Sequence, residues 1–147
     1  QTFRSLAASL RNLAARRASP IGVPNERVLD MPVDEFIRRN RTLAAELAAI
    51  ERDAAGNPTL REELNAFLEG RLEAGAREVG ARRPDLVEFF LDRGEVIVTD
   101  FTVNTSRVHR LKTAFYREVM AALLGRRGPR VSSLDINLQT GESDVRP

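Results

Sequence analysis

Two aspartates, Asp85 and Asp100, have the residue type and the spacing to share a cation. Asp85 opens the apolar run 86–91, and Asp100 closes a second run, 95–99, which is rich in β-branched residues. The sequence between them, 92–94, predicts a hairpin turn, so the start of one strand would lie beside the end of the next. Neighbouring carboxylates repel each other unless a cation lies between them. The pattern therefore predicts a divalent-metal site.

The composition limits which metal this site can hold. The chain has no cysteine and one histidine, which excludes thiolate sites and zinc sites made of several histidines. A metal held mainly by oxygen ligands is typically Mg²⁺ or Mn²⁺.

A second group of candidate residues follows the two strands. Lys112 is the only lysine among the 23 basic residues, and the only histidine and the only tyrosine, His109 and Tyr116, lie within four positions of it. At spacings of three and four, the three side chains share one face of a predicted helix. They could line a site or belong to an ordinary surface helix.

The periodicity of apolar residues predicts the elements that hold these groups. Helices are expected over 2–17, 33–55, 60–79 and from Asn104 or Thr105 to 124, and strands over 86–91, 95–99 and 130–138. Asn57 or Thr59 would cap the third helix, and the polar tail 140–147 is expected to be loose. A right-handed crossover through the last helix would give a mixed sheet with helices packed against it.

Two further acidic residues have less certain surroundings. Glu78 shares the apolar face of the third predicted helix, and a buried carboxylate needs a partner. That partner is either Arg71 or a metal. Asp135 lies in the last predicted strand, where simple alternation places it toward solvent.

Pro84-Asp85, the hairpin and Asp100-Phe101-Thr102 resemble the PD-(D/E)xK motif of restriction-endonuclease-like nucleases. The order of predicted elements over 60–138 is also similar to the core of that superfamily. Thr102 stands where the motif has its lysine, but viral cap-snatching endonucleases place the lysine on the following helix, as Lys112 is here. The resemblance implies an α/β (α+β) fold with a helical extension at 1–57 and a restriction-endonuclease-like core at 58–147, together one compact domain.

The same resemblance implies a metal-dependent nuclease and gives each residue a role. Asp85, Asp100 and the backbone carbonyl of Phe101 would hold Mg²⁺ or Mn²⁺, joined by a helix-borne carboxylate from Glu78 or, as alternatives, Glu63 or Glu46. The ammonium group of Lys112 would orient water or stabilise negative charge. His109 and Tyr116 would contact the scissile phosphate or the leaving group. The remaining candidates would contact other parts of the nucleic acid: Arg82, Arg83, Thr102, Arg107, Arg110 and Arg117.

The composition also suggests a biological setting. Apolar residues make up 42% and charged residues 30%, as in ordinary globular proteins, and no apolar run reaches the ~20 residues of a membrane span. The chain starts at Gln1 and is expected to be a piece of a longer protein. An arginine-dominated nuclease piece resembles the toxin domains of bacterial polymorphic toxins, which are delivered to the cytoplasm of a target cell and are silenced by an immunity protein, here expected to be acidic. A viral cap-snatching endonuclease and a non-catalytic interaction module on the same fold are the alternatives, and the choice between DNA and RNA stays open.

Overall fold

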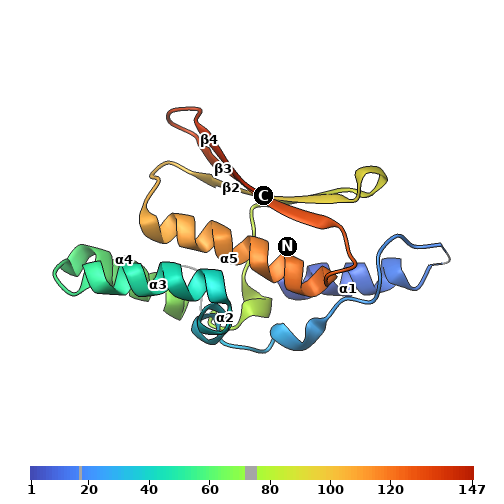
Figure 1. The fold of residues 1–147 in the computed structure, drawn as a ribbon, viewed down its shortest axis with the longest axis horizontal. Coiled ribbons are helices and arrows are strands. Elements are labelled where there is room, and N and C mark those ends of the chain that lie inside the picture. Colours follow the sequence, from blue (N-terminus) through green and yellow to red (C-terminus); the bar gives the residue numbers. More distant parts are fainter. Residues whose placement is uncertain (17, 72–75) are drawn as a thin grey trace.

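The computed structural model describes residues 1–16, 18–71 and 76–147. A four-stranded sheet lies on one side of a long helix, α5 (Arg107–Leu124), and the other helices lie on its opposite side (Figure 1). The strands follow one another across the sheet: β1 (Leu86–Phe90), β2 (Glu95–Thr102), β3 (Arg130–Asn137) and β4 (Ser143–Arg146). β2 and β3 are parallel, and both outer pairs are antiparallel. The mixed sheet and the α/β class expected from the sequence are therefore confirmed.

Four helices precede the sheet. They are α1 (Phe3–Ala14), α2 (Val33–Arg39), α3 (Arg41–Ala54) and α4 (Pro58–Glu69), with short 3₁₀ turns at Glu26–Val28, Val79–Ala81 and Leu91–Arg93. Side chains cap α1 and α4, the second through Asn57, one of the two caps that the sequence predicts. The Thr2 hydroxyl accepts a hydrogen bond from the backbone N–H of Ser5, and the Asn57 side chain accepts one from that of Leu60.

Two predicted helices are shorter than the periodicity indicates. The stretch 33–55 is divided at Asn40, whose extended backbone ends α2 and whose side chain caps α3. The predicted helix over 60–79 ends at Gly70, which has a φ of 67° and forms a left-handed C-cap. Glu78 therefore lies beyond the end of this helix, where it forms an isolated β-bridge with Pro32. Residues 72–75 and Arg17, which the predicted helices included, lie outside the described residues.

The C-terminal half also differs in detail from the prediction. Ser106, rather than Asn104 or Thr105, caps α5 by accepting a hydrogen bond from the backbone N–H of His109. The tail that was expected to be loose contains β4, which pairs with β3 at the edge of the sheet. β2 continues to Thr102, so Asp100 lies inside the strand and not at its end.

Helix α5 is the centre of the core. Its residues Leu111, Phe115 and Tyr116 are fully buried. The Phe115 ring packs edge-on against Phe36 of α2 and Phe67 of α4, with ring centres 5.7 and 6.0 Å apart. Truncation of such a buried phenylalanine to alanine typically costs about 3–5 kcal/mol. The position of α5 over the sheet is thus fixed by packing along its whole length.

One buried cluster joins the N-terminal helices to the sheet. It contains Phe3 of α1 and Leu43 of α3 together with Val96 of β2. The division of the chain at residues 57 and 58 stays a prediction. Among the described residues, no helix is long and apolar enough to cross a membrane.

Candidate active site

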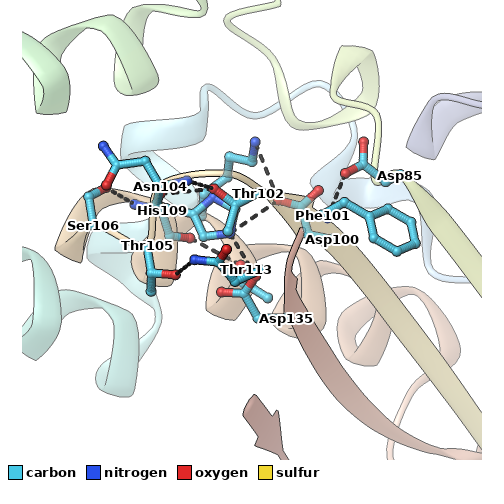
Figure 2. Close-up of polar contacts among 12 residues, drawn as sticks. Asp85, Asp100, Phe101, Thr102, Asn104, Thr105, Ser106, His109, Thr113 and Asp135 are labelled. Carbon is cyan, nitrogen blue, oxygen red and sulfur yellow. Dashed lines mark hydrogen bonds and ion pairs between the residues drawn. The ribbon is translucent and has the colours of Figure 1, made fainter. Parts of the chain in front are cut away.

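Asp85 and Asp100 lie side by side, as their positions around the hairpin indicate. Leu86 pairs with Thr99 in the antiparallel ladder, so the residues that follow outward, Asp85 and Asp100, face each other in the same register. Asp85 is exposed, and its Oδ2 accepts a hydrogen bond of 2.9 Å from the backbone N–H of Phe101 (Figure 2). Asp100 is only 1% exposed, and neither of its carboxylate oxygens has a hydrogen-bond partner.

This difference in burial separates the acidities of the two groups. Burial raises the pKa of Asp100 to about 8, and the neighbouring Asp85 adds to the rise while Lys112 opposes it. Burial also raises the pKa of Asp85, but the Asp100 carboxyl, the Phe101 N–H and the charges of Lys112 and His109 outweigh it, and the net shift is downward. At neutral pH the pair therefore holds about one negative charge, on Asp85.

Two side chains of α5 reach the buried aspartate. The Nζ atom of Lys112 lies 3.4 Å from Oδ2 of Asp100, and Nε2 of His109 lies 3.6 Å from the same oxygen. Residues three apart on a helix share a face, so the first turns of α5 bring both groups to one point of the sheet. The predicted proximity of the lysine and the histidine to Asp100 is thus present in the structure.

Asp135 is a site residue that the sequence interpretation placed wrongly. It is buried, and its Oδ1 lies 2.8 Å from Nε2 of His109 (Figure 2). Asp135 is the direct partner of Asp100 in the parallel ladder, so both carboxylates are on the sheet face that α5 covers. Alternation alone predicted solvent because Leu134 and Ile136 are the more hydrophobic set. The β2–β3 register that places Asp135 beside Asp100 is not fixed by any local pattern in the sequence.

The strand register produces a row of aspartates across the sheet. Asp85, Asp100, Asp135 and Asp144 occupy equivalent positions from β1 to β4. The two inner members are buried under α5, and the two outer members are exposed. From α5, the Lys112 ammonium lies 3.4 Å from Asp100 and the His109 ring lies 2.8 Å from Asp135.

The connection from β2 to α5 positions these helix residues. The Thr102 hydroxyl donates to the carbonyl of Asn104 at 2.8 Å and accepts from its N–H at 3.1 Å. The Thr105 hydroxyl accepts a hydrogen bond of 3.1 Å from Nδ2 of Asn137 on β3. Thr102, proposed as a contact of the nucleic acid, thus has its hydroxyl engaged in this turn.

The carboxylates proposed to join the metal from a helix lie elsewhere. Glu78 is at an ion-pair distance of 3.4 Å from Arg4, and Glu46 is paired with Arg146 at 2.5 Å. Glu63 of α4 accepts a hydrogen bond from the Ser106 hydroxyl, which places it at the N-terminus of α5. Of the three alternatives, Glu63 is therefore the one held against the helix that carries His109 and Lys112.

Tyr116 belongs to the core. It is 0% exposed, its ring packs edge-on against Phe3 at 5.6 Å, and Nζ of Lys112 lies 5.8 Å above it. A buried ring cannot contact a phosphate, so the predicted role at the scissile bond is wrong. Tyr116 instead supports the stem of Lys112.

The arginines proposed as a basic rim are divided between the interior and the surface. Arg82 is buried and donates hydrogen bonds to the carbonyls of Phe67 and Ala76, and Arg117 pairs with its neighbour Glu118 at 2.7 Å. Arg107 pairs with Asp53 of α3. Arg83 and Arg110 are exposed, and Arg110 lies beside Asp135 and Asp144. The continuous rim expected from the sequence is not formed.

The geometry of Asp85 and Asp100 is compatible with a bound divalent cation. Both side-chain oxygens of Asp100 are buried without a hydrogen-bond partner, and the Lys112 ammonium lies 3.4 Å from Oδ2, so Asp100 keeps acceptor capacity that a cation could use. Within the described ranges, no cluster of three or more histidine or acidic side chains is arranged to hold a metal. Mg²⁺ commonly uses one or two carboxylates and takes its remaining ligands from water and substrate phosphate, which suits Asp85 and Asp100 alone.

Comparison with known proteins adds no family to this geometry. Neither a protein-family model nor a curated protein matches the chain.

Proposed function

We propose that this domain is a divalent-metal-dependent nuclease that hydrolyses phosphodiester bonds at Asp85 and Asp100. The observation that carries the proposal is the state of Asp100, a buried carboxylate without hydrogen-bond donors beside a second aspartate and a lysine. Burying such a group costs stability, and buried titratable groups of this kind are concentrated at functional sites.

Asp85 and Asp100 would hold the cation, and the carbonyl of Phe101 remains a predicted further ligand. A bound Mg²⁺ or Mn²⁺ supplies an activated water and neutralises charge on the phosphate. The Phe101 N–H donates to Oδ2 of Asp85 and so holds this carboxylate in place. With a cation bound, the pKa of Asp100 would fall and both carboxylates could ionise.

Lys112 would act on the substrate once a cation is present. Its ammonium group lies 3.4 Å from Asp100 and its side chain is 31% exposed, so Lys112 lies between the buried carboxyl group and solvent. Once Asp85 and Asp100 held a cation, the Lys112 ammonium would be available to the substrate. It can then donate hydrogen bonds to the scissile phosphate and stabilise the negative charge that develops there.

His109 favours a second candidate function, metal-independent cleavage of RNA. The 2.8 Å contact with Asp135 orients its ring next to Lys112, as in a general base held by a carboxylate. In this reaction the RNA 2′-oxygen attacks the neighbouring phosphorus and its proton passes to His109. The bond from phosphorus to the 5′-oxygen breaks, Lys112 protonates that oxygen, and a cyclic 2′,3′-phosphate remains.

One set of incubations separates these functions. Supercoiled plasmid, RNA and the matching DNA oligonucleotide are each incubated with Mg²⁺, Mn²⁺ or EDTA. Cleavage that requires a metal and is lost in Asp100→Asn supports the proposed nuclease. Cleavage of RNA alone, undiminished by EDTA, supports the second candidate. Asp92→Asn, at the exposed turn of the same hairpin, is the matched control and should behave as the parent.

The proposed setting is a nuclease toxin with an acidic immunity protein. The observation that supports it is electrostatic, since exposed or half-exposed cations, among them Lys112, Arg110 and Arg146, lie at or near the aspartate row. Expression in a bacterium from a tightly controlled promoter tests it. The parent should arrest growth and Asp100→Asn should not. Normal growth with soluble, active protein would contradict the toxin assignment, and failure to bind any metal would favour a non-catalytic module.

A further inference from the structure

A cavity of about 260 Å³ opens beside the aspartate pair, between α4 and the N-terminal half of α5. Phe67 and Ala66 of α4 and Val108 of α5 form its apolar wall. Its volume is close to ~300 Å³, the lower end of the range for small-molecule pockets, and far above the roughly 30 Å³ that one water occupies. The cavity therefore has room for a planar ring system.

The walls of this cavity are built rigidly. The guanidinium of Arg82, also part of the lining, lies 5.1 Å from the centre of the Phe67 ring and is held by the Phe67 and Ala76 carbonyls. Gly70 closes α4 at the cavity, and a Cβ there would come within 2.5 Å of the Ala76 carbonyl oxygen. The close approach of the two backbones fixes the shape of the wall before any ligand arrives.

The polar groups of the cavity are at two different places. Lys112 and His109, which contact Asp100, are part of its lining, so the cavity is continuous with the aspartate site. Glu63 is an exposed carboxylate held by the Ser106 hydroxyl. A ligand with a phosphate at Lys112 and a ring against Phe67 and Val108 would bring the polar edge of the ring within reach of this carboxylate. That combination of groups describes a nucleotide.

We infer that this cavity binds an unpaired nucleobase next to the scissile phosphate, and that the domain acts on single-stranded nucleic acid. This inference rests on the proposed function of the aspartate pair. A base in a duplex is stacked and paired, and it must leave the helix to enter such a cavity. Glu63 accepts hydrogen bonds only, so it favours bases with N–H donors on their edge. Guanine, which presents two adjacent donors, should bind best.

Binding of mononucleotides tests the cavity without any cleavage. Guanosine 5′-monophosphate, uridine 5′-monophosphate and ribose 5-phosphate are titrated in EDTA and followed by calorimetry or by NMR shifts of α4 and α5. The guanine nucleotide should bind at least tenfold more tightly than ribose 5-phosphate, and also more tightly than the uracil nucleotide. Equal affinity for the guanine nucleotide and ribose 5-phosphate would overturn the inference.

Three variants, one of them a control, test whether the guanine nucleotide binds in this cavity. Ala66→Phe fills the cavity from α4 and should reduce binding of the guanine nucleotide about tenfold, to the level of ribose 5-phosphate. Ala45→Phe, at an exposed position of α3, is the matched control and should bind as the parent. Glu63→Ala should remove the preference for guanine over uracil and retain binding of both. Parent-like binding by a folded Ala66→Phe protein would show that the base does not enter this cavity.

Cleavage of oligonucleotides separates the failure of this inference from failure of the proposed function. The same sequence is offered single-stranded and in a duplex, with the activating metal. The single strand should be cut at least tenfold faster by the parent and by Ala45→Phe, and Ala66→Phe should lose most of that advantage. Equal cleavage of both forms, abolished by Asp100→Asn, would retain the nuclease and reject the cavity. Binding of the guanine nucleotide without cleavage of any substrate would reject the nuclease and retain the cavity.

Discussion

Asp100 and Asp135 are the same residue type at equivalent positions of neighbouring strands, yet their surroundings differ. Both are buried beneath α5, and they are direct partners in the parallel ladder. Asp135 has a hydrogen-bond partner at 2.8 Å in His109, whereas the oxygens of Asp100 have none. Asp100 also adjoins a third carboxylate, Asp85, and its pKa is raised to about 8. Position in the sheet alone therefore does not decide what an aspartate does.

The helix above the sheet makes the difference. His109 and Lys112 are one turn apart on α5, and both approach Oδ2 of Asp100. The imidazole meets Asp135 at 2.8 Å with hydrogen-bond geometry, while the ammonium stays at 3.4 Å from Asp100. Asp135 thus has a hydrogen-bond partner and holds the His109 ring in place. The oxygens of Asp100, in contrast, can still accept a hydrogen bond or bind a cation. The comparison predicts that Asp135 holds a side chain in place and that Asp100 binds the cation.

The largest expected effect is that of Asp100→Asn. Loss of one of two metal-binding carboxylates should abolish metal-dependent cleavage, a fall of at least about a thousandfold. Without metal the variant should be at least as stable as the parent at neutral pH, because the amide is already neutral, whereas buried Asp100 must take up a proton when the chain folds. Calorimetric titration with Mn²⁺ and thermal melting in EDTA measure both effects. Equal Mn²⁺ affinity in parent and variant would remove Asp100 from the site.

Lys112→Ala should have the next largest effect. Removal of a cation that stabilises the reacting phosphate typically costs about a hundredfold to a thousandfold in rate. Affinity for Mn²⁺ should change little, since an ammonium group does not ligate metals. Lys112→Arg should be faster than Lys112→Ala because it keeps the positive charge. It should be slower than the parent because the arginine charge is spread over a broader group. Arg127→Ala, an exposed cation beyond the other end of α5, is the control. Full activity in Lys112→Ala would show that Lys112 does not take the role of the motif lysine that Thr102 replaces.

The acidity of Asp100 predicts a pH dependence of stability in the absence of metal. Its pKa in the folded protein, about 8, is above its ordinary value of 3.8, so the folded state binds the proton more tightly. The stabilising contribution is fully present below about pH 4 and is lost as the pH rises to 8. From pH 5 to 7 the free energy of unfolding should fall by about 1 kcal/mol per pH unit from this group. Asp100→Asn should lack this component when both proteins are melted in EDTA, and identical slopes would contradict the assignment.

The smallest of the effects should come from Asp135→Asn. The asparagine oxygen can still accept a hydrogen bond from His109, so only the charge of the support is lost. Replacement of such outer partners typically costs about tenfold to a hundredfold in activity, and the lower end is expected here. Activity assays with the activating metal, beside the parent and Asp100→Asn, measure this effect. A loss of activity as large as that of Asp100→Asn would show that the two aspartates do not have the different roles assigned to them.

The sequence by itself determined the hairpin, the mixed sheet and the face of α5 that carries the reactive groups. These follow from local patterns: glycine and aspartate in a turn, alternating β-branched residues, and recurrence of three and four along a helix. The meeting of Asp85 with Asp100 followed from the hairpin, because a tight turn fixes the register of the two strands it joins. The proximity of Lys112 to Asp100 was expected from the resemblance to nucleases that carry their lysine on the following helix.

Only the tertiary structure decided which other residues share the site. The partnership of Asp135 with Asp100 depends on the register of two strands separated by a whole helix, and no local pattern fixes that register. Glu78 was assigned to a helix that Gly70 ends, because apolar spacing continued beyond the glycine. Tyr116 and Arg82 were expected at the surface, but burial depends on which helices pack against them, here α1 and α4. Long-range packing sets burial, and burial in turn sets the pKa of Asp100 and the roles of its neighbours.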